Sequence, residues 1–292
     1  RIASVVGLVA SLLTIHTGDK SAVTVADVQP MKLAAMEALY DGGQNVGLTA
    51  VAWLTPFEQP DYAKGGEAPL RIAIPGGLSL LATHDFNGYV PGVNDVLKGY
   101  LKPDGTKELS AKEKIARGKT AINALAEYRK LKAKDAHDPR LATLQAQLQA
   151  NMKYFGYGFI KNEAELVPYI PICFWAFRAM VGLGTLFVLF FIVSLFLVYK
   201  KDIARFGWLH YAGLVMLPLA YIASEAGWIV AELGRQPWTI QDLMPAPAAV
   251  SDLHPGSVML TFFLFLVLFT VLLAVEVSIM CKQIKKGMTT ER

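Results

Sequence analysis

The sequence predicts an all-α integral membrane protein, a transmembrane helical bundle with a large extracytoplasmic, partly helical loop domain. Of its 292 residues, 53% are hydrophobic and only 18% are charged, a composition that is unusually apolar for a soluble chain of this length. The apolar residues gather in four stretches, and a run of about 20 such residues lets a helix cross a bilayer. A long polar stretch separates the first apolar stretch from the second.

The apolar stretches predict the membrane helices. The first of them, residues 2–16, is shorter than a span, and residue 1 is Arg rather than Met. We therefore expect residues 1–18 to be the end of a transmembrane helix that begins upstream in a longer polypeptide. Residues 168–200, 208–233 and 257–281 are each long enough to span the membrane.

Charges beside these helices predict their orientation. The connector at residues 201–207 and the end of the helix before it carry Lys200, Lys201 and Arg205, and the tail at residues 282–292 carries Lys282, Lys285, Lys286 and Arg292. Because basic residues next to spans favour the cytoplasmic side, both segments are expected to be cytoplasmic. The polar domain at residues 19–167 and the loop at residues 234–256 then face outside.

The polar domain contains the pattern of a helical hairpin. Ser110 and Glu113 form a capping box before an apolar helical pattern, and Asp138-Pro139 opens a second helix. Its apolar stripe recurs at steps of three and four residues, at Leu141, Leu144, Leu148, Met152 and Phe155. Glycine and proline are frequent between residues 42 and 91, which predicts loops with short extended pieces.

Two function classes are disfavoured by composition. The net charge is +4, and no basic stripe interleaves with aromatic residues, so nucleic acid is not an expected partner. No two of the five histidines have the spacing of metal ligands, which argues against a self-contained zinc or di-iron site.

Two acidic residues lie inside the apolar stretch 208–233. Glu225 and Glu232 are seven residues apart and share nearly one helical face, with Trp228 between them. A charged carboxylate in hydrocarbon costs several kcal/mol unless it is paired, protonated or ligating, so both are candidate functional residues. Solvation by the outer loop is the alternative, and an ion-binding or proton-coupled transporter is the alternative function.

Basic and sulfur-containing side chains also occur within the apolar stretches or at their ends. Arg178 falls about ten residues into the apolar stretch 168–200, and Met180 lies two residues beyond it. Methionine in a membrane helix is usually a packing residue, but its thioether can also be an axial ligand of haem iron. Arg235 follows a helix end, where it could snorkel to water or bind carboxylates with its planar fork.

Lys32 and Glu37 follow the first helix in a short helical pattern. Solvated charges are the ordinary interpretation. At a membrane surface, however, such a pair could hydrogen-bond the two oxygens of a quinol head and accept its protons.

These motifs together resemble subunit I of cytochrome bd-type quinol oxidases. The Gly-Arg-Gln-Pro-Trp box is highly specific for that family, the Lys-Leu-Ala-Ala tract is fairly specific, and the Arg-x-Met tract is weak by itself. The resemblance covers the whole chain but only the carboxy-terminal part of that subunit, in its long quinol-loop subtype. The matching tracts are Gly18-Asp19, Asp27–Gln29, Lys32–Glu37, Phe177–Met180, Glu225–Trp228 and Glu232–Trp238.

The resemblance implies roles for these residues. Lys32 and Glu37 would interact with quinol, Met180 would be the axial ligand of a low-spin haem b, and Glu232 would ligate a high-spin haem b.

The resemblance also places Arg178 as a base beside a haem and Trp228 among the haems. From the geometry of its side chain, Arg235 is a candidate anchor for haem propionates. Glu225 is a candidate acid of a proton route or haem pocket.

The implied function is that of a quinol:dioxygen oxidoreductase in the bacterial cytoplasmic membrane, which oxidises quinol outside, reduces dioxygen with cytoplasmic protons and generates a proton motive force. The expected cofactors are low-spin haem b, high-spin haem b and haem d. In that family the other haem ligands lie in the first five helices. The expected partners are therefore the amino-terminal helices of the same subunit, oxidase subunit II, small single-span subunits, quinol, dioxygen and membrane lipid.

Overall fold

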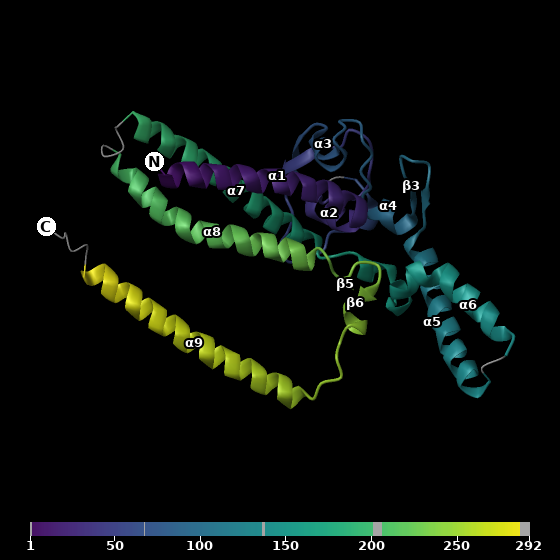
Figure 1. The fold of residues 1–292 in the computed structure, drawn as a ribbon. Helices are drawn as coiled ribbons and strands as arrows, with labels where there is room; N and C mark the ends of the chain where they lie inside the picture. Colours follow the sequence, from purple (N-terminus) through teal and green to yellow (C-terminus); the bar gives the residue numbers. More distant parts are fainter. Residues whose placement is uncertain (1, 67, 136–137, 201–205, 287–292) are drawn as a thin grey trace. The chain divides into compact units, whose positions relative to one another are not determined.

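The computed structural model describes residues 2–66, 68–135, 138–200 and 206–286, most of which are helical (Figure 1). The chain divides into two compact units, residues 1–249 and 250–292. Within the described residues, four helical segments are long and apolar enough to cross a membrane. They contain helices α1 (Ile2–Val28), α7 (Ile170–Tyr199), α8 (Gly207–Leu233) and α9 (Pro255–Lys286). The helical membrane fold class is confirmed.

Helix α1 is longer than the sequence predicted. We expected a helix end at residue 18, but α1 continues to Val28, and its 27 residues suffice for a span. Helix α3 (Gly77–Thr83) packs against α1, and His84 Nε2 lies 3.4 Å from Asp19, whereas Lys20 and Asp27 of the last turns are exposed. The helix ends before Gln29, because a residue that precedes proline is disfavoured in helical conformation. The charged residues that begin at Asp19 therefore did not mark the end of α1.

Helices α1, α7 and α8 form a bundle in which α7 contacts both others. At Gly7 of α1 the backbone lies so close to the Phe191 ring of α7 that a Cβ would collide with it. Helix α7 runs antiparallel to α1 and α8 (Figure 1). The polar residues 29–169 and the loop after residue 233 are consequently at the same end of the bundle. Which side of a membrane this end faces stays a prediction.

The helix bounds differ slightly from the expected ones. Helices α7 and α8 match the predicted ranges to within about two residues, whereas α9 runs to Lys286 rather than to residue 281. Residues 201–205 of the expected connector and 287–292 of the expected tail lie outside the described residues.

The polar domain begins with short elements joined by loops, in agreement with its glycine and proline content. These are α2 (Pro30–Glu37), strand β1 (Leu48–Val51), the 3-10 helix η1 (Tyr62–Lys64), β2 (Ile72–Ile74), α3, α4 (Val93–Lys98), β3 (Tyr100–Leu101) and β4 (Lys107–Glu108). Strands β1 and β2 pair antiparallel, as do β3 and β4.

The predicted hairpin is present as α5 (Ala111–Lys134) packed on α6 (Arg140–Asn151). The capping box at its start is confirmed, since Ser110 Oγ accepts the Glu113 N–H at 3.3 Å and the Glu113 carboxylate accepts the Ser110 N–H at 3.0 Å. At the second helix, Asp138 accepts the Arg140 N–H at 2.9 Å.

The end of this hairpin corrects one prediction. Met152 and Phe155, expected to continue the stripe of α6, lie instead in the 3-10 helix η2 (Met152–Phe159), which packs along α5. Gly158 in this segment lies against the backbone of Gly118, where a Cβ would collide. The 3-10 winding of η2 therefore occurs where its backbone contacts that of α5. The spacing of apolar residues does not reveal such a contact.

The remaining elements of the first unit are the 3-10 helix η3 (Glu163–Leu166), strand β5 (Trp238–Ile240), strand β6 (Met244–Pro245) and the 3-10 helix η5 (Ala246–Ala248). Strands β5 and β6 form an antiparallel pair after α8.

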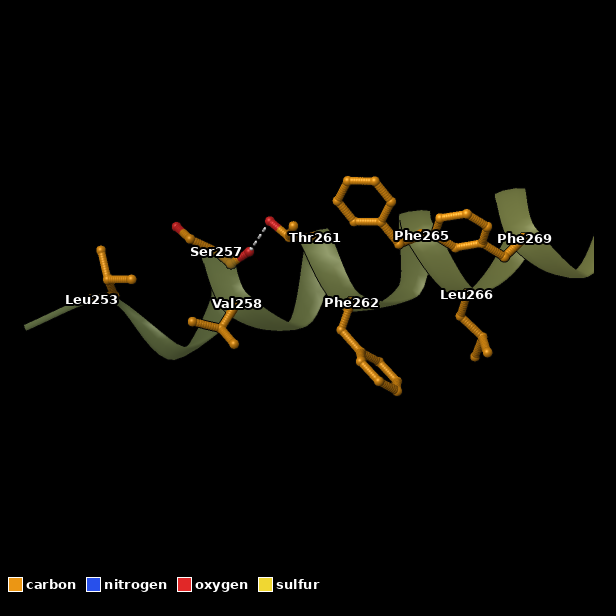
Figure 2. Close-up of a pocket in the computed structure, with 8 residues that line it drawn as sticks. All are labelled: Leu253, Ser257, Val258, Thr261, Phe262, Phe265, Leu266 and Phe269. Carbon is orange, nitrogen blue, oxygen red and sulfur yellow. Dashed lines mark hydrogen bonds between the residues drawn. The ribbon is translucent and has the colours of Figure 1, made fainter. Parts of the chain in front are cut away.

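The second unit consists of α9 and the segment before it. Figure 2 shows a hollow on this segment, with the side chains of Val258, Phe262 and Leu266 on one side and the Phe265 and Phe269 rings on the other. The rings of Phe265 and Phe269 stack with centroids 5.9 Å apart. No titratable side chain lines this hollow among the described residues, so it offers an apolar surface without catalytic groups.

Candidate functional site

Helix α2 positions Lys32 and Glu37, the two charged residues of the tract Lys32–Glu37. Leu33, Ala34 and Ala35 are almost completely buried, because α2 packs on α7 and lies between two clusters of buried apolar side chains. The helix starts at Pro30, where a missing N–H is harmless, and ends at Ala38 in left-handed conformation with φ of 49°. The small side chains of Ala34 and Ala35 allow this close packing.

Glu37 at the end of α2 forms a buried ion pair with Arg178 of α7. The two Arg178 terminal nitrogens donate to the carboxylate oxygens at 2.7 and 3.1 Å, and the side chains are only 1% and 12% exposed for Glu37 and Arg178. Arg178 also donates to the backbone carbonyls of Met36, at 2.6 Å, and of Thr49. These acceptors occupy the planar fork of the guanidinium, which holds α2, β1 and α7 together.

The surroundings of this pair change the acidity of Glu37. Burial raises the pKa of its carboxyl above the usual value, although the Arg178 guanidinium and the Thr49 N–H act in the opposite direction. The Arg178 guanidinium lies over the Phe174 ring at 4.1 Å from its centroid, a favourable cation–π contact. Glu37 is therefore a carboxylate in a restricted environment that can hold a proton at higher pH than a solvated one.

Strand β1 and Arg71 support this pair, and sequence patterns did not indicate them. Arg71 Nε donates to Thr49 Oγ1 at 2.9 Å, and its terminal nitrogen donates to the Gly47 carbonyl at 2.8 Å. Thr49 N in turn donates to Glu37 at 3.4 Å. No short sequence pattern links these residues, because the loops between α2 and β2 bring them together in the folded chain.

Lys32 lies on another side of α2 and meets the turn after α8. A Cβ at Gly234 would lie only 3.0 Å from Lys32 Cγ, so the lysine stem runs along this glycine. Burial lowers the pKa of Lys32 and the charge of Arg235 lowers it further, whereas Cys173 and Glu232 oppose the change. Lys32 and Glu37, which we expected to act as one pair, thus have different partners.

The second ion pair lies at the end of α8. Arg235 donates to a Glu232 oxygen at 2.6 Å, and the side chains are 35% and 41% exposed for Arg235 and Glu232. The helix ends at Gly234, as predicted, and this lets the chain turn so that Arg235 reaches back to Glu232. Arg235 Nε is buried yet has no hydrogen-bond partner among the residues that the structure describes. A buried donor of this kind favours an acceptor supplied from elsewhere.

Met180 faces α8 from α7. A Cβ at Gly227 would lie 3.0 Å from its sulfur, so this glycine makes room for the thioether. Ala226 and Val230 are the buried residues of this part of α8, whereas Trp228 is 61% exposed and Glu225 is exposed. The stripe of Glu225, Trp228 and Glu232 therefore lies away from α7, on a face of α8 that is left uncovered within the first unit.

Comparison with known proteins agrees with this geometry. A family model described as cytochrome bd terminal oxidase subunit I matches residues 1–288. The chain is 32% identical over 296 residues to cytochrome bd-II ubiquinol oxidase subunit 1 of Escherichia coli (strain K12), covering 98% of this chain and 54% of that protein. It is 28% identical over 289 residues to cytochrome bd ubiquinol oxidase subunit 1 of Bacillus subtilis (strain 168), covering 98% and 48%.

A solved structure shows the same fold. The structure of bd oxidase from Geobacillus thermodenitrificans aligns with a TM-score of 0.58 at 22% identity, covering 96% of this chain and 47% of that chain. The chain spans about half the length of the curated relatives it matches. Since the family model extends over nearly all of the sequence, the chain belongs to the cytochrome bd terminal oxidase subunit I family.

Proposed function

We propose that this chain is part of the haem-bearing subunit of a membrane quinol:dioxygen oxidoreductase of the cytochrome bd type. Two relatives are named as ubiquinol oxidase subunits, which supports quinol as the reductant. The observation that carries the proposal is the turn at residues 234–238, in which Arg235 binds Glu232 and keeps one buried donor unsatisfied.

The residues at this turn fit a haem. The unpartnered Arg235 Nε suits a propionate carboxylate, the Glu232 carboxylate could ligate the iron of a high-spin haem b, and the Met180 thioether could ligate that of a low-spin haem b. Haem iron, when bound, supplies one-electron transfer and the binding of dioxygen, while the protein sets ligand, burial and orientation.

The outer part of the site would bind and deprotonate quinol. Glu37 would accept a proton from a quinol hydroxyl, because its raised pKa lets it hold that proton. Lys32 would donate a hydrogen bond to the other side of the quinol head. Arg178 keeps the Glu37 carboxylate oriented and is two residues from Met180 on α7, so the residue that orients the proton acceptor and the proposed axial ligand lie on one helix.

The remaining site residues have proposed roles on the uncovered face of α8. Trp228 would pack among the haems, and Glu225 would serve as an acid of the haem pocket or of a proton route. Haem d is the proposed third cofactor, with ligands on the amino-terminal helices of the same subunit. Oxidase subunit II and small single-span subunits complete the proposed complex.

The proposed orientation makes the reaction electrogenic. Quinol would be oxidised at the outer face of a bacterial cytoplasmic membrane and release its protons there, while reduction of dioxygen to water would take protons from the cytoplasm. This separation of charge generates a proton motive force. Basic residues beside the helix ends support the orientation.

A spectrum of the purified complex that contains this chain tests the proposal. We expect b-type haem bands in the reduced-minus-oxidised spectrum, a far-red band that shifts with carbon monoxide, and quinol-dependent oxygen consumption. Met180→Leu should remove the low-spin haem b signal, whereas Met216→Leu on α8 should keep it. A transporter that uses Glu225 and Glu232 would give a flat spectrum from the intact complex, and that result would refute the oxidase proposal.

A further inference from the structure

A cavity of about 260 Å³ lies apart from the two ion pairs, where the end of α1 and the start of α2 meet the helical hairpin and strand β5. Asp27 and Val28 contribute from α1, Pro30 and Met31 from α2, and Trp238 from β5. The proposed haem and quinol residues do not line it. The cavity is therefore distinct from the proposed haem and quinol sites.

One wall of this cavity is rich in positive charge. The Glu108 carboxylate lies 2.6 Å from Lys114 Nζ and 3.6 Å from Lys102 Nζ, and Lys153 also lines the cavity. Burial acts to raise the pKa of Glu108, but the hydrogen bond and charge of Lys114, with the charges of Lys102 and Lys153, hold it below its usual range. Two ammonium groups thus lie near one carboxylate and a third lines the same cavity, which leaves an excess of cations on this wall.

The other acidic groups of the cavity are placed differently. Asp242 accepts hydrogen bonds from the Tyr157 hydroxyl at 2.5 Å and from the Gln241 amide at 3.1 Å, so neutral donors satisfy it. Asp27 is exposed at the last turn of α1. The cavity therefore presents cations on the Glu108 wall and the exposed carboxylate of Asp27 at the side of the membrane helix.

A second cavity of about 170 Å³ adjoins the first and shares Asp27, Tyr100 and Lys102 with it. Val23 and Ala26 from the last turns of α1 line it, together with Val90 and Pro91 of the polar domain. Because α1 is long and apolar enough to span a membrane, we expect its last turns to lie where hydrocarbon meets water. The two cavities together offer a charged end and an apolar end at the depth of lipid headgroups.

We propose that these cavities form a phospholipid site, in which Lys102 and Lys153 bind the phosphodiester, Asp27 binds the ammonium of an ethanolamine headgroup, and the apolar cavity holds the first part of an acyl chain. Lysine side chains form strong charge-assisted hydrogen bonds with phosphate, and Glu108 binds Lys114 closely, at 2.6 Å, but lies 3.6 Å from Lys102. A zwitterionic headgroup matches the opposite charges at the two sides. Free phosphate would leave the carboxylate and the apolar cavity unused.

The site lies next to the quinol-binding helix of the proposed function but does not depend on it. Met31, which lines the first cavity, directly precedes Lys32. A bound lipid would therefore pack against the first turn of α2. Its presence can be measured by binding alone, without turnover.

The test is a titration of the delipidated complex with dioleoyl phosphatidylethanolamine, followed by native mass spectrometry. The double variant Lys102→Gln/Lys153→Gln should raise the dissociation constant of one lipid at least about tenfold, as expected for the loss of two charged hydrogen bonds. The control Lys119→Gln/Lys130→Gln removes two exposed lysines of α5 outside the cavity and should bind like the wild type. Lys102→Arg/Lys153→Arg should keep the site.

Three results would overturn the proposal. A galactolipid with the same acyl chains but no phosphate could bind equally well. The Gln and control variants could retain the lipid equally. Inorganic phosphate at millimolar concentration could displace the lipid from the site, which would identify a free-anion site instead.

Discussion

The two arginine–carboxylate pairs of this chain have the same chemistry but opposite surroundings. Glu37 and Arg178 are 141 positions apart in sequence and join two helices, and both side chains are buried. Glu232 and Arg235 are three positions apart, lie at a helix end and are more than a third exposed. The guanidinium fork of Arg178 is occupied by protein acceptors, whereas Arg235 keeps an unsatisfied buried donor.

This difference separates a structural connection from an open site. Removing one partner of a buried pair leaves an uncompensated charge, which costs several kcal/mol. An exposed local pair contributes much less to stability. The first pair should therefore matter for stability and geometry in addition to the proposed proton transfer at Glu37, and the second mainly for what binds beside it.

The largest expected effect is on stability, from Arg178→Gln. This change leaves the Glu37 carboxylate buried without its partner and should cost about 3–5 kcal/mol. Thermal unfolding of the purified complex measures it. The same chemical change at Arg235 should cost less than about 1 kcal/mol. Equal shifts of the two midpoints would contradict the distinction between the pairs.

Glu232→Gln should show the reverse pattern. We expect the complex to lose most of its high-spin haem b, because an amide is a poor replacement for the carboxylate ligand, while the unfolding midpoint changes little. Haem content per complex is the measurement. Glu276→Gln, the same acid-to-amide change at an exposed residue of α9 with no proposed role, serves as the control and should retain the haem. Full haem occupancy in Glu232→Gln would show that this carboxylate is not a ligand.

The buried pair also predicts a pH dependence. Glu37 can accept a proton only when it is ionised, and its pKa is raised. Quinol oxidation should therefore fall as the pH drops through that raised pKa, at a higher pH than an ordinary glutamate would give. Steady-state rates measured against pH test this. Glu37→Gln should be slower at all pH values and should lack the acidic limb, and an unchanged limb would assign it to another group.

The smallest effect is expected from Arg235→Lys, which keeps the charge but removes the planar fork and the Nε donor. Stability should change by only a few tenths of a kcal/mol, because the pair is local and partly exposed. The reduction potential of the high-spin haem b should shift, since a propionate would lose one hydrogen bond. An identical potential in a spectroelectrochemical titration would argue against Arg235 as the propionate anchor.

Much of the architecture follows from local sequence signals. Three spans, the capping box at Ser110 and the helix end at Gly234 were predicted because hydropathy and helix caps act over one or a few turns. The extension of α1 to Val28 was missed, since its last turns carry charged residues and the contacts of α1 with α2 and α3 arise only from the tertiary fold. The 3-10 winding at Met152 was missed because a distant glycine, Gly118, allows the backbone contact.

The sequence by itself determined the family motifs, the membrane helices and the identity of the charged candidates, because these depend on residue type and spacing. Only the tertiary structure decided the partners. Arg178 binds Glu37, and Lys32 lies along Gly234 instead of beside Glu37. Such choices depend on how helices pack across long loops, and a charge selects its partner only among the groups that packing brings within a few ångströms.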